Sequence, residues 1–302
     1  MTTTMERRSV SQYRATKTAG TLVLHIVLAI VGFLCIMPMI LVISTSVSSD
    51  LAVAKNGLSL LPQDFTLYTY KFVLNNPSQL LRAYAVTIIV TVTGTIGGLL
   101  VSALIGYALA HKDFKFRGTV VFIVVFTMLF SGGMVPTYLV VRTWLGLHDN
   151  LLALILPTMV IQWYIMMFRS HFASLPPEIM ESAKMDGAGE WRLFAQMAMP
   201  LSKPWLATIG LMYVLKYWNE WLPAMMYIQN PDLFPLQYLL QALVRNAQFL
   251  KSVATAMTSQ VKIPGLSLQM AMVVVAAGPA MFVFMFLQKY FVRGITAGAV
   301  KG

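Results

Sequence analysis

The chain has 302 residues, of which 58% are hydrophobic and only 11% charged, and its formal net charge is +11. Because a typical soluble domain is about 25% charged, this composition excludes an ordinary soluble globule. One cysteine, Cys35, and four dispersed histidines exclude an internal disulfide and a cysteine- or histidine-rich metal site. We expect an all-α, polytopic membrane protein without catalytic or metal-binding residues, whose basic residues reflect cytoplasmic loops rather than nucleic-acid binding.

Six apolar stretches are long enough to cross a bilayer, which takes about 20 helical residues. They cover residues 20–46, 83–110, 118–141, 151–169, 204–228 and 267–291. This pattern divides the chain into an N-terminal segment 1–19, a six-span domain 20–291 and a tail 292–302. Lys and Arg are concentrated in the two terminal segments, the 111–117 turn and a long loop, 170–203. By the positive-inside rule, these segments and both termini are expected on the cytoplasmic side of the membrane.

Small and helix-breaking residues modify several of these stretches. In the second, small residues recur every four positions and predict close helix packing; they are Gly94, Gly98, Ser102, Gly106 and Ala110. Pro38 and Gly278-Pro279 predict kinks in the first and sixth stretches.

The third stretch is interrupted by Ser131, Gly132 and Gly133, with Pro136 close behind. Backbone outside a helix is tolerated within a membrane only where it is buried in protein or lines a wet cavity. These residues are therefore either a simple re-entrant turn or part of a path for a transported molecule. Asp149 and Asn150 follow as candidate N-caps of the fourth stretch.

The long basic loop 170–203 predicts a helix–turn–helix outside the bilayer. Ser174 is a candidate N-cap, with Pro176 and Pro177 in the first turn. Gly187 is expected to end this helix in a left-handed conformation, and Glu190 opens a second amphipathic piece. Such a pair either connects two spans or binds a partner.

The same loop resembles the EAA loop of ABC importer permeases: Glu-Ala-Ala, three residues, Gly, nine residues, Ile-x-Leu-Pro. This chain has Glu181-Ser182-Ala183, then Gly187, then Met197-Ala198-Met199-Pro200, with the same spacing at every position. Ser182, Met197 and Met199 depart from the pattern but remain small or apolar. The fuller run from Glu178 through Asp186 to Pro204 is similar to the carbohydrate-uptake class.

The resemblance extends over essentially the whole chain. Segments 130–138, 218–221 and 287–302 look like maltose-permease-like subunits for oligosaccharides, among them permeases for acidic sugars such as alginate. It implies half of a translocation path in a bacterial inner membrane, which pairs with a second permease, often a different chain. Two ATPase subunits would use ATP and Mg, a solute-binding protein would deliver the sugar from outside, and this chain would bind no cofactor.

The resemblance also implies which residues meet the ATPase. They are Glu178, Glu181, Ser182, Ala183, Asp186, Gly187, Glu190 and Pro200. A short helix that ends at a glycine can move as a lever, and its acidic first turn can meet basic groups on a partner.

The fifth stretch places charges inside the membrane. Lys216 and Glu220 are four residues apart and share a helix face, with Trp218 and Asn219 between them. Intramembrane charges are costly and usually face the bundle interior or a wet cavity. They either form a salt bridge that only satisfies both groups, or belong to a polar patch along the sugar path.

The loop 229–266 is long and, in this orientation, lies outside the cell. Its amide-rich segment contains Gln237, Gln241, Arg245 and Asn246. In the family that the chain resembles, this loop can reach into the binding protein and displace the sugar. The alternative is a surface helix packed on the membrane.

Two other classes of function remain at this point. An ion-gradient-driven secondary sugar transporter would commonly show internal repeats and charged midplane residues in both halves, and neither pattern is evident. A membrane-embedded enzyme would need paired ionisable groups on facing spans, and these are also missing. We therefore expect the permease subunit of an ATP-driven importer, in contact with membrane lipid.

Overall fold

The computed structural model describes residues 2–75, 77–256 and 265–299. These residues are mostly helical, and an isolated antiparallel bridge between Ser48 and Phe65 is the β-type pairing among them. The all-α expectation is confirmed. The chain forms two compact units, unit 1 from Met1–Val73 and Ala247–Val275, and unit 2 from Leu74–Asn246 and Ala276–Gly302.

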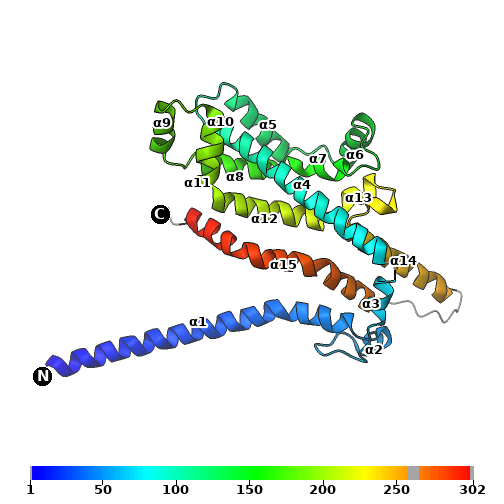
Figure 1. Ribbon diagram of the computed structural model, residues 1–302. Coiled ribbons are helices and arrows are strands. Elements are labelled where there is room, and N and C mark those ends of the chain that lie inside the picture. Colours follow the sequence, from blue (N-terminus) through cyan, green and yellow to red (C-terminus); the bar gives the residue numbers. More distant parts are fainter. Residues whose placement is uncertain (1, 76, 257–264, 300–302) are drawn as a thin grey trace. The chain divides into compact units, whose positions relative to one another are not determined.

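Unit 1 contains α1 (Thr2–Ser46), α2 (Asp50–Asn56) and α3 (Tyr68–Val73), together with the end of α14 and the start of α15 (Leu266–Ala299) (Figure 1). The carboxylate of Asp50 accepts hydrogen bonds from the backbone N–H groups of Gly265 (2.8 Å) and Ser267 (3.1 Å). Because the first N–H groups of a helix have no partner within it, Asp50 supplies an acceptor for the start of α15.

The apolar part of α1 is uncovered within the described chain. Val23–Ser46 has a mean hydropathy of 3.1, and none of its most apolar window is buried. An apolar surface of this length needs lipid or another protein against it. The helix runs without interruption from Thr2 and passes through Pro38.

Unit 2 is built around α4 (Pro77–Ala110), on which α7 (Leu152–Met159), α8 (Gln162–Phe172) and α12 (Lys203–Asn219) pack. The predicted stripe of small residues lies at these contacts. A Cβ atom at Gly94, Gly98 or Gly106 would lie 2.4, 2.6 or 2.5 Å from Tyr217, Tyr213 or Phe168, respectively. These glycines are therefore what allows the helices to approach so closely, as expected.

Three of the predicted stretches are broken helices. α5 (Arg117–Leu129) and the pair α6 (Met134–Leu139) and η1 (Val140–Trp144) are bent by 117° across the glycine-containing interruption. This confirms the break predicted in the third stretch.

The fourth stretch, 151–169, also contains a break, which the sequence analysis did not predict. α7 and α8 are bent by 48°, and Val160 and Ile161 between them are extended. The break leaves the Met159 carbonyl at the end of α7 without a partner in the helix, and two tyrosines of α12 donate to this carbonyl and to an earlier one. The Tyr213 hydroxyl donates to the Met159 carbonyl, and the Tyr217 hydroxyl donates to the Ile155 carbonyl, both at 2.9 Å.

The fifth stretch is also interrupted. α12 ends at Asn219, Glu220 is extended, and α13 (Leu222–Tyr227) follows. By length and composition, Val23–Ser46 and Pro77–Ala110 are the described helices that can cross a membrane alone, and each bent pair can add one more span. The number of six spans therefore stays a prediction.

The predicted long loop 229–266 is largely helical where it is described. It contains the 3₁₀ turn η3 (Pro231–Leu233) and α14 (Leu236–Ala256), which continues from unit 2 into unit 1. Residues 257–264 of this loop and residues 300–302 of the predicted tail lie outside the described residues.

Candidate functional site

The first helix of the basic loop, α9, covers Pro177–Met185 and is preceded by Pro176. The expectation that Ser174 caps it is wrong, because the Ser174 hydroxyl donates to the His171 carbonyl at 2.8 Å. An N-cap side chain accepts from the N–H of the second or third residue after it. From position 174 those residues are Pro176 and Pro177, which have no N–H to donate.

Gly187 ends α9 in the left-handed conformation that its position predicted, with φ of +80°. The Gly187 N–H donates to the Lys184 carbonyl, and the Ala188 N–H donates to the Ala183 carbonyl, both at 3.0 Å. These two bonds form a Schellman motif, in which a left-handed residue lets the chain reverse after a helix. Glycine adopts this conformation without a steric penalty.

The second helix of the loop begins at Glu190. It runs through α10 (Glu190–Arg192), the π-helical segment η2 (Leu193–Ala198) and α11 (Met199–Leu201). Pro200 lies in its last turn and has no N–H for the carbonyl four residues earlier, and a wide π-type turn precedes it. Leu193, Phe194 and Ala198 on this helix are buried.

The expected partner-binding residues of α9 and the turn are mostly exposed. Glu178, Glu181, Ser182 and Asp186 are exposed, and so are Glu190 and Pro200 of the second helix. Ala183 is buried, at 7% exposure, while the neighbouring Met185 is 88% exposed. α9 thus presents an acidic surface with an exposed methionine at its C-terminal end.

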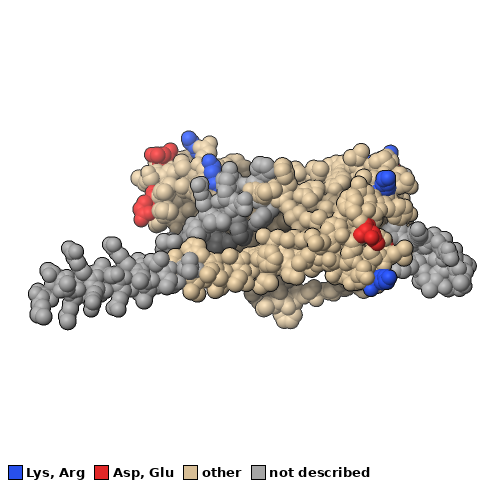
Figure 2. Space-filling model, turned by 90° about the horizontal axis from the view of Figure 1, so that it is seen from below, with Lys and Arg blue, Asp and Glu red and all other residues tan. Residues whose placement is uncertain are grey.

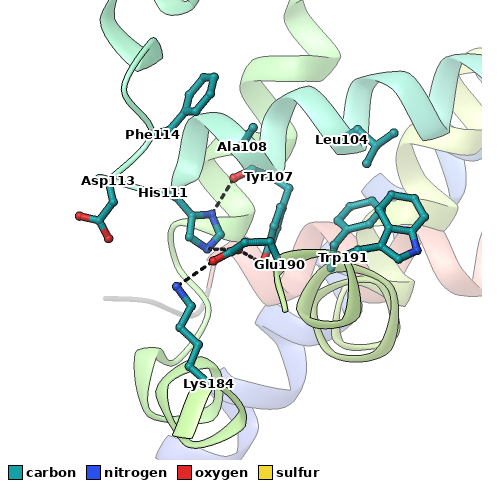
Figure 3. A pocket seen from close by; sticks show the side chains of 10 residues that line it. Leu104, Tyr107, Ala108, His111, Asp113, Phe114, Lys184, Glu190 and Trp191 are labelled. Carbon is teal, nitrogen blue, oxygen red and sulfur yellow. Dashed lines mark hydrogen bonds and ion pairs between the residues drawn. The ribbon is translucent and has the colours of Figure 1, made fainter. Parts of the chain in front are cut away.

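Glu190 turns back toward its own chain. Its carboxylate lies 3.0 Å from Lys184 Nζ of α9, 3.5 Å from the Tyr107 hydroxyl and 4.0 Å from His111 Nε2. These groups border a cavity of about 390 Å³ between the end of α4 and the loop helices (Figure 3). Its remaining lining residues are Leu104, Ala108, Asp113, Phe114, Trp191 and Phe194.

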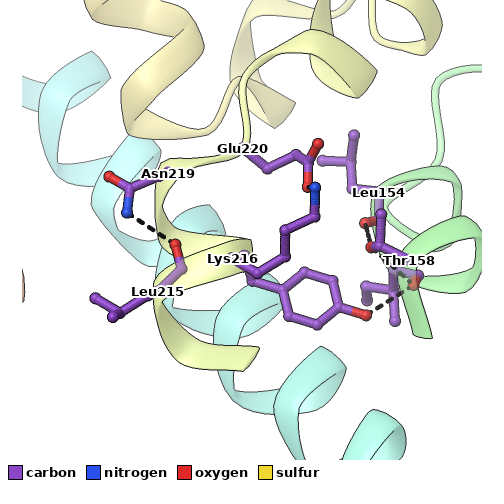
Figure 4. Close-up of polar contacts among 8 residues, drawn as sticks. Leu154, Thr158, Leu215, Lys216, Asn219 and Glu220 are labelled. Atoms are coloured by element: carbon purple, nitrogen blue, oxygen red, sulfur yellow. Dashed lines mark hydrogen bonds and ion pairs between the residues drawn. The ribbon is translucent and has the colours of Figure 1, made fainter. Parts of the chain in front are cut away.

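Lys216 and Glu220 form the expected contact at the end of α12. Lys216 Nζ lies 2.9 Å from the Glu220 carboxylate, with side chains 43% and 19% exposed (Figure 4). Asn219 is exposed, and its amide donates to the Leu215 carbonyl at 2.8 Å. The two charges thus lie beside each other, but the buried Glu220 Oε2 atom makes no hydrogen bond to the described residues.

Trp218 does not join this polar patch. Its ring is buried, and its Nε1 donates to the Ala276 carbonyl of α15 at 3.1 Å. Ser131, Gly132 and Gly133 are exposed at the bend between α5 and α6. No contact described for these three residues brings them to Lys216.

The amide-rich segment, by contrast, reaches the polar patch. The Gln237 side-chain amide of α14 lies 3.4 Å from the Asn219 side-chain oxygen. Further along α14, the Arg245 guanidinium lies over the Tyr238 ring, 5.7 Å from its centre. Gln241 and Asn246 are exposed. Asn219 of the predicted path and Gln237 of the predicted loop are thus neighbours at this end of unit 2.

Sequence reasoning assigned Asp149 only a capping role. Its carboxylate accepts hydrogen bonds from the N–H groups of Gln229 (2.5 Å) and Asn230 (2.9 Å), and its own N–H donates to the Tyr227 carbonyl (3.0 Å). It thereby links the start of α7 to the end of α13. The bonds from Asn230 and Gln229 lower the pKa of the Asp149 carboxyl.

Charged side chains are sparse on the surface of the described chain. Figure 2 shows a face on which a few acidic and basic groups are separated by a broad uncharged area. An uncharged surface of this kind suits contact with lipid hydrocarbon, where charges are costly.

Comparisons with known proteins agree with this architecture. Residues 102–297 match the family described as "Binding-protein-dependent transport system inner membrane component". The chain is 36% identical over 271 residues to the polygalacturonan/rhamnogalacturonan transport system permease protein YtcP of Bacillus subtilis (strain 168), covering 90% of this chain and 94% of that protein. It is 38% identical over 272 residues to protein LplC of the same organism, covering 90% and 91%.

A solved structure is similar over nearly the same length. It is the crystal structure of a bacterial ABC transporter involved in the import of the acidic polysaccharide alginate, with a TM-score of 0.75 and 29% identity. The similarity covers 91% of this chain and 98% of that one. The chain therefore belongs to the inner membrane component family of binding-protein-dependent transport systems, and it is a transport subunit rather than an enzyme.

Proposed function

We propose that this chain forms half of the translocation path of an ATP-driven importer for an oligosaccharide. The observation that carries the proposal is the Gly187-terminated helix α9, which presents an exposed acidic surface within the region that matches the permease family. A second permease chain, two ATPase subunits using ATP and Mg, and an extracytoplasmic binding protein complete the assembly. The comparisons give no support to the ion-gradient-driven alternative.

The proposed arrangement has six spans with both termini in the cytoplasm. α1, α4, the two bent pairs, α12 with α13, and α15 supply one span each. Broken helices are acceptable as spans when neighbouring side chains satisfy the freed carbonyls, as Tyr213 and Tyr217 do for α7. The basic residues of the α9 loop then lie inside, as the positive-inside rule requires.

In this arrangement α9 couples ATP hydrolysis to transport. Glu178 and Glu181 offer negative charge to basic groups of an ATPase, and Met185 offers an exposed apolar contact. The left-handed turn at Gly187 fixes the direction in which the chain leaves the helix. A displacement of α9 is thereby passed to the helix that begins at Glu190.

Substitutions in α9 and its turn test the coupling role. We expect Glu181→Lys and Gly187→Asp to leave membrane insertion and binding-protein function intact. Uptake should fall, and ATP hydrolysis should no longer respond to sugar-loaded binding protein. The measurement is stimulated hydrolysis beside uptake in liposomes; wild-type values for both variants would mean that the loop is only a connector.

Alanine variants of two glycines distinguish the effect of backbone strain on coupling from the effect of replacing any glycine in this turn. An alanine at Gly187 would have to keep φ near +80°, at a cost of about 1–2 kcal/mol. Gly189 has φ of −72°, and an added Cβ would meet nothing within 4 Å. Gly187→Ala should therefore impair coupling, whereas Gly189→Ala should not.

We further propose that the oligosaccharide is acidic. The similar solved transporter imports the acidic polysaccharide alginate, and the YtcP relative is named for polygalacturonan and rhamnogalacturonan. In the proposed orientation, basic residues outnumber acidic ones in the outer loops, and a positive entrance raises the local concentration of an anion. Uptake of acidic and neutral oligosaccharides of equal length tests this; a preference for the neutral sugar would contradict it.

To test whether the ion pair between Lys216 and Glu220 lies on the sugar path, both residues must be replaced together. Lys216→Met alone would leave the mostly buried Glu220 without its partner, so lost uptake would reflect instability. Lys216→Met combined with Glu220→Gln removes both charges. If the pair lies on the sugar path, the double variant should insert normally and change sugar preference; an unchanged preference would leave the pair a structural one.

A further inference from the structure

α9 is attached to the rest of unit 2 by few contacts. Of its nine residues, Ala183 is buried and Met180 is partly buried, and both pack in or against the core cluster that contains Phe172 and Leu193. The chain also connects α9 to unit 2 at both of its ends. A short helix held along one face can still rotate about that contact unless a polar contact fixes its orientation.

On the side that faces α4, apolar packing does not fix the orientation of α9. The 390 Å³ cavity lies between the end of α4, with Tyr107 and His111, and the loop helices that carry Lys184 and Glu190. Across an open space of this size, close van der Waals contact is lost. Polar groups at the cavity rim are therefore the contacts that can connect α9 with α4.

Glu190 is the group at which those contacts meet. Its carboxylate is 3.0 Å from Lys184 Nζ on α9, and it reaches the Tyr107 hydroxyl (3.5 Å) and His111 Nε2 (4.0 Å) on α4. His111 is itself fixed, because its Nδ1 lies 3.0 Å from the Tyr107 carbonyl and its ring packs edge-on against Tyr107. Figure 3 shows Glu190 between the two helices.

We propose that Glu190 is a positioning residue, which holds α9 at a fixed orientation to α4 through Lys184, Tyr107 and His111. The proposal rests on the coupling role proposed for α9. It gives Glu190 an internal contact in place of the contact with the ATPase that the sequence suggested. A rigid link between α9 and α4 lets a displacement at the ATPase reach a membrane helix without loss in a flexible turn.

The contact is suited to positioning rather than to folding stability. The Glu190 side chain is 64% exposed and that of Lys184 43% exposed, and exposed ion pairs add little to stability. Variants of this pair should therefore insert and assemble normally. What they should change is the range of orientations that α9 adopts.

The test measures coupling and ATPase attachment separately. In the complex with the partner permease and ATPase subunits, Glu190→Gln should lower the ratio of sugar transported to ATP hydrolysed by about fivefold or more. The amount of ATPase that co-purifies should not change. Glu181→Lys, at the proposed contact with the ATPase, should instead reduce co-purification.

Two further variants make the test specific. Asp113→Asn removes a carboxylate from the rim of the same cavity and has no described contact with α9, so it should transport like the parent. Lys184→Glu combined with Glu190→Lys restores an opposite-charge pair and should recover much of the lost coupling. Glu190→Asp, which is shorter by one methylene, should fall between parent and Glu190→Gln.

A distance measurement reports on orientation directly. With Cys35 replaced by Ser, spin labels at Met185 on α9 and at Lys115 beyond α4 should give a broader distance distribution in Glu190→Gln than in the parent. The proposal is overturned if Glu190→Gln behaves like Asp113→Asn, if the charge exchange restores nothing, or if Glu190→Gln loses its ATPase as Glu181→Lys does. If Glu181→Lys and Gly187→Asp leave coupling unchanged, the coupling role of α9 fails instead.

Discussion

Individual polar side chains form hydrogen bonds to backbone groups of unit 2 near the ends of its broken helices. Tyr213 and Tyr217 of α12 donate to carbonyls of α7, and Asp149 accepts from the two N–H groups that follow α13. Backbone groups at the ends of helices need such partners, because the helix itself leaves them unpaired. The sequence contains these residues but no pattern that reveals which distant carbonyl or N–H each one meets.

Asp149 gives a pH-dependent prediction at this scale. Hydrogen bonds from Asn230 and Gln229 lower its pKa in the folded protein below the ordinary value of about 3.9. A carboxyl with a lowered folded pKa stabilises the fold at pH values above its unfolded pKa, and this stabilisation is lost as the pH falls through the folded pKa. Asp149→Asn should thus unfold at a lower temperature than the parent at pH 7, and the difference should shrink as the pH falls below about 4, toward the folded pKa.

Asparagine tolerates left-handed backbone, so the substitution tests the charge and not the φ of +51° at Asp149. Asp64→Asn is the matched control, because Asp64 also has positive φ (+46°) and is exposed. Thermal unfolding of the purified complex in detergent, followed between pH 7 and pH 3, is the measurement. Equal midpoints for Asp149→Asn and the parent at pH 7 would contradict the prediction.

At the scale of helices, hydropathy predicted where they are, but not all of their interruptions. The break in the third stretch was visible because Gly132 and Gly133 stand together. In the fourth, only Pro157 precedes the extended Val160, and proline near a helix end is common. The break after Asn219 has a local cause, because Pro223 has no N–H for the Asn219 carbonyl four residues earlier. Asp149 then links α13 to the start of α7.

The glycine stripe of α4 allows a prediction about helix packing. A Cβ at Gly98 would lie 2.6 Å from the Tyr213 ring, which is fully buried. The ring cannot move easily, because its hydroxyl forms hydrogen bonds with Ser102 Oγ (2.7 Å) and with the Met159 carbonyl. We expect Gly98→Ala to destabilise the protein by about 1–3 kcal/mol through overpacking.

The control for this substitution is Gly118→Ala in α5, where an added Cβ meets nothing within 4 Å. Alanine is the better helix former by about 1 kcal/mol, so this variant should be neutral or slightly stabilised. Unfolding temperatures of both variants in the same detergent provide the comparison. If Gly98→Ala matches Gly118→Ala, close approach of α12 to α4 does not depend on the stripe.

For the whole molecule, the sequence motif indicated the loop that contains the proposed coupling helix, but not which of its residues turn toward their own chain. The spacing from Glu181 to Pro200 does not show that Glu190 turns inward while Glu181 remains exposed. That division depends on Tyr107 and His111, which are distant in the sequence. Likewise, Gln237 and Asn219 were predicted for separate roles, and only the fold makes them neighbours.

We expect the exposed polar side of α14 to contact the extracytoplasmic binding protein. One side of α14 is buried through Leu236, Leu239 and Leu240, so a deletion within it would damage the core as well as a surface. Gln241 and Arg245 are exposed and share a helix face. Replacing both with alanine should preserve insertion and unfolding temperature while reducing ATP hydrolysis stimulated by sugar-loaded binding protein.

A matched control removes one positive charge and one amide elsewhere on the same proposed outer side. Lys71 and Asn75 are both exposed, and Lys71→Ala combined with Asn75→Ala should leave stimulation at the parent level. The measurement is the hydrolysis rate against binding-protein concentration, beside sugar uptake. A contact surface should lose affinity for its partner when its polar groups are removed. If ATP hydrolysis in the α14 double variant is stimulated as in the parent, this face of α14 therefore contacts lipid or solvent.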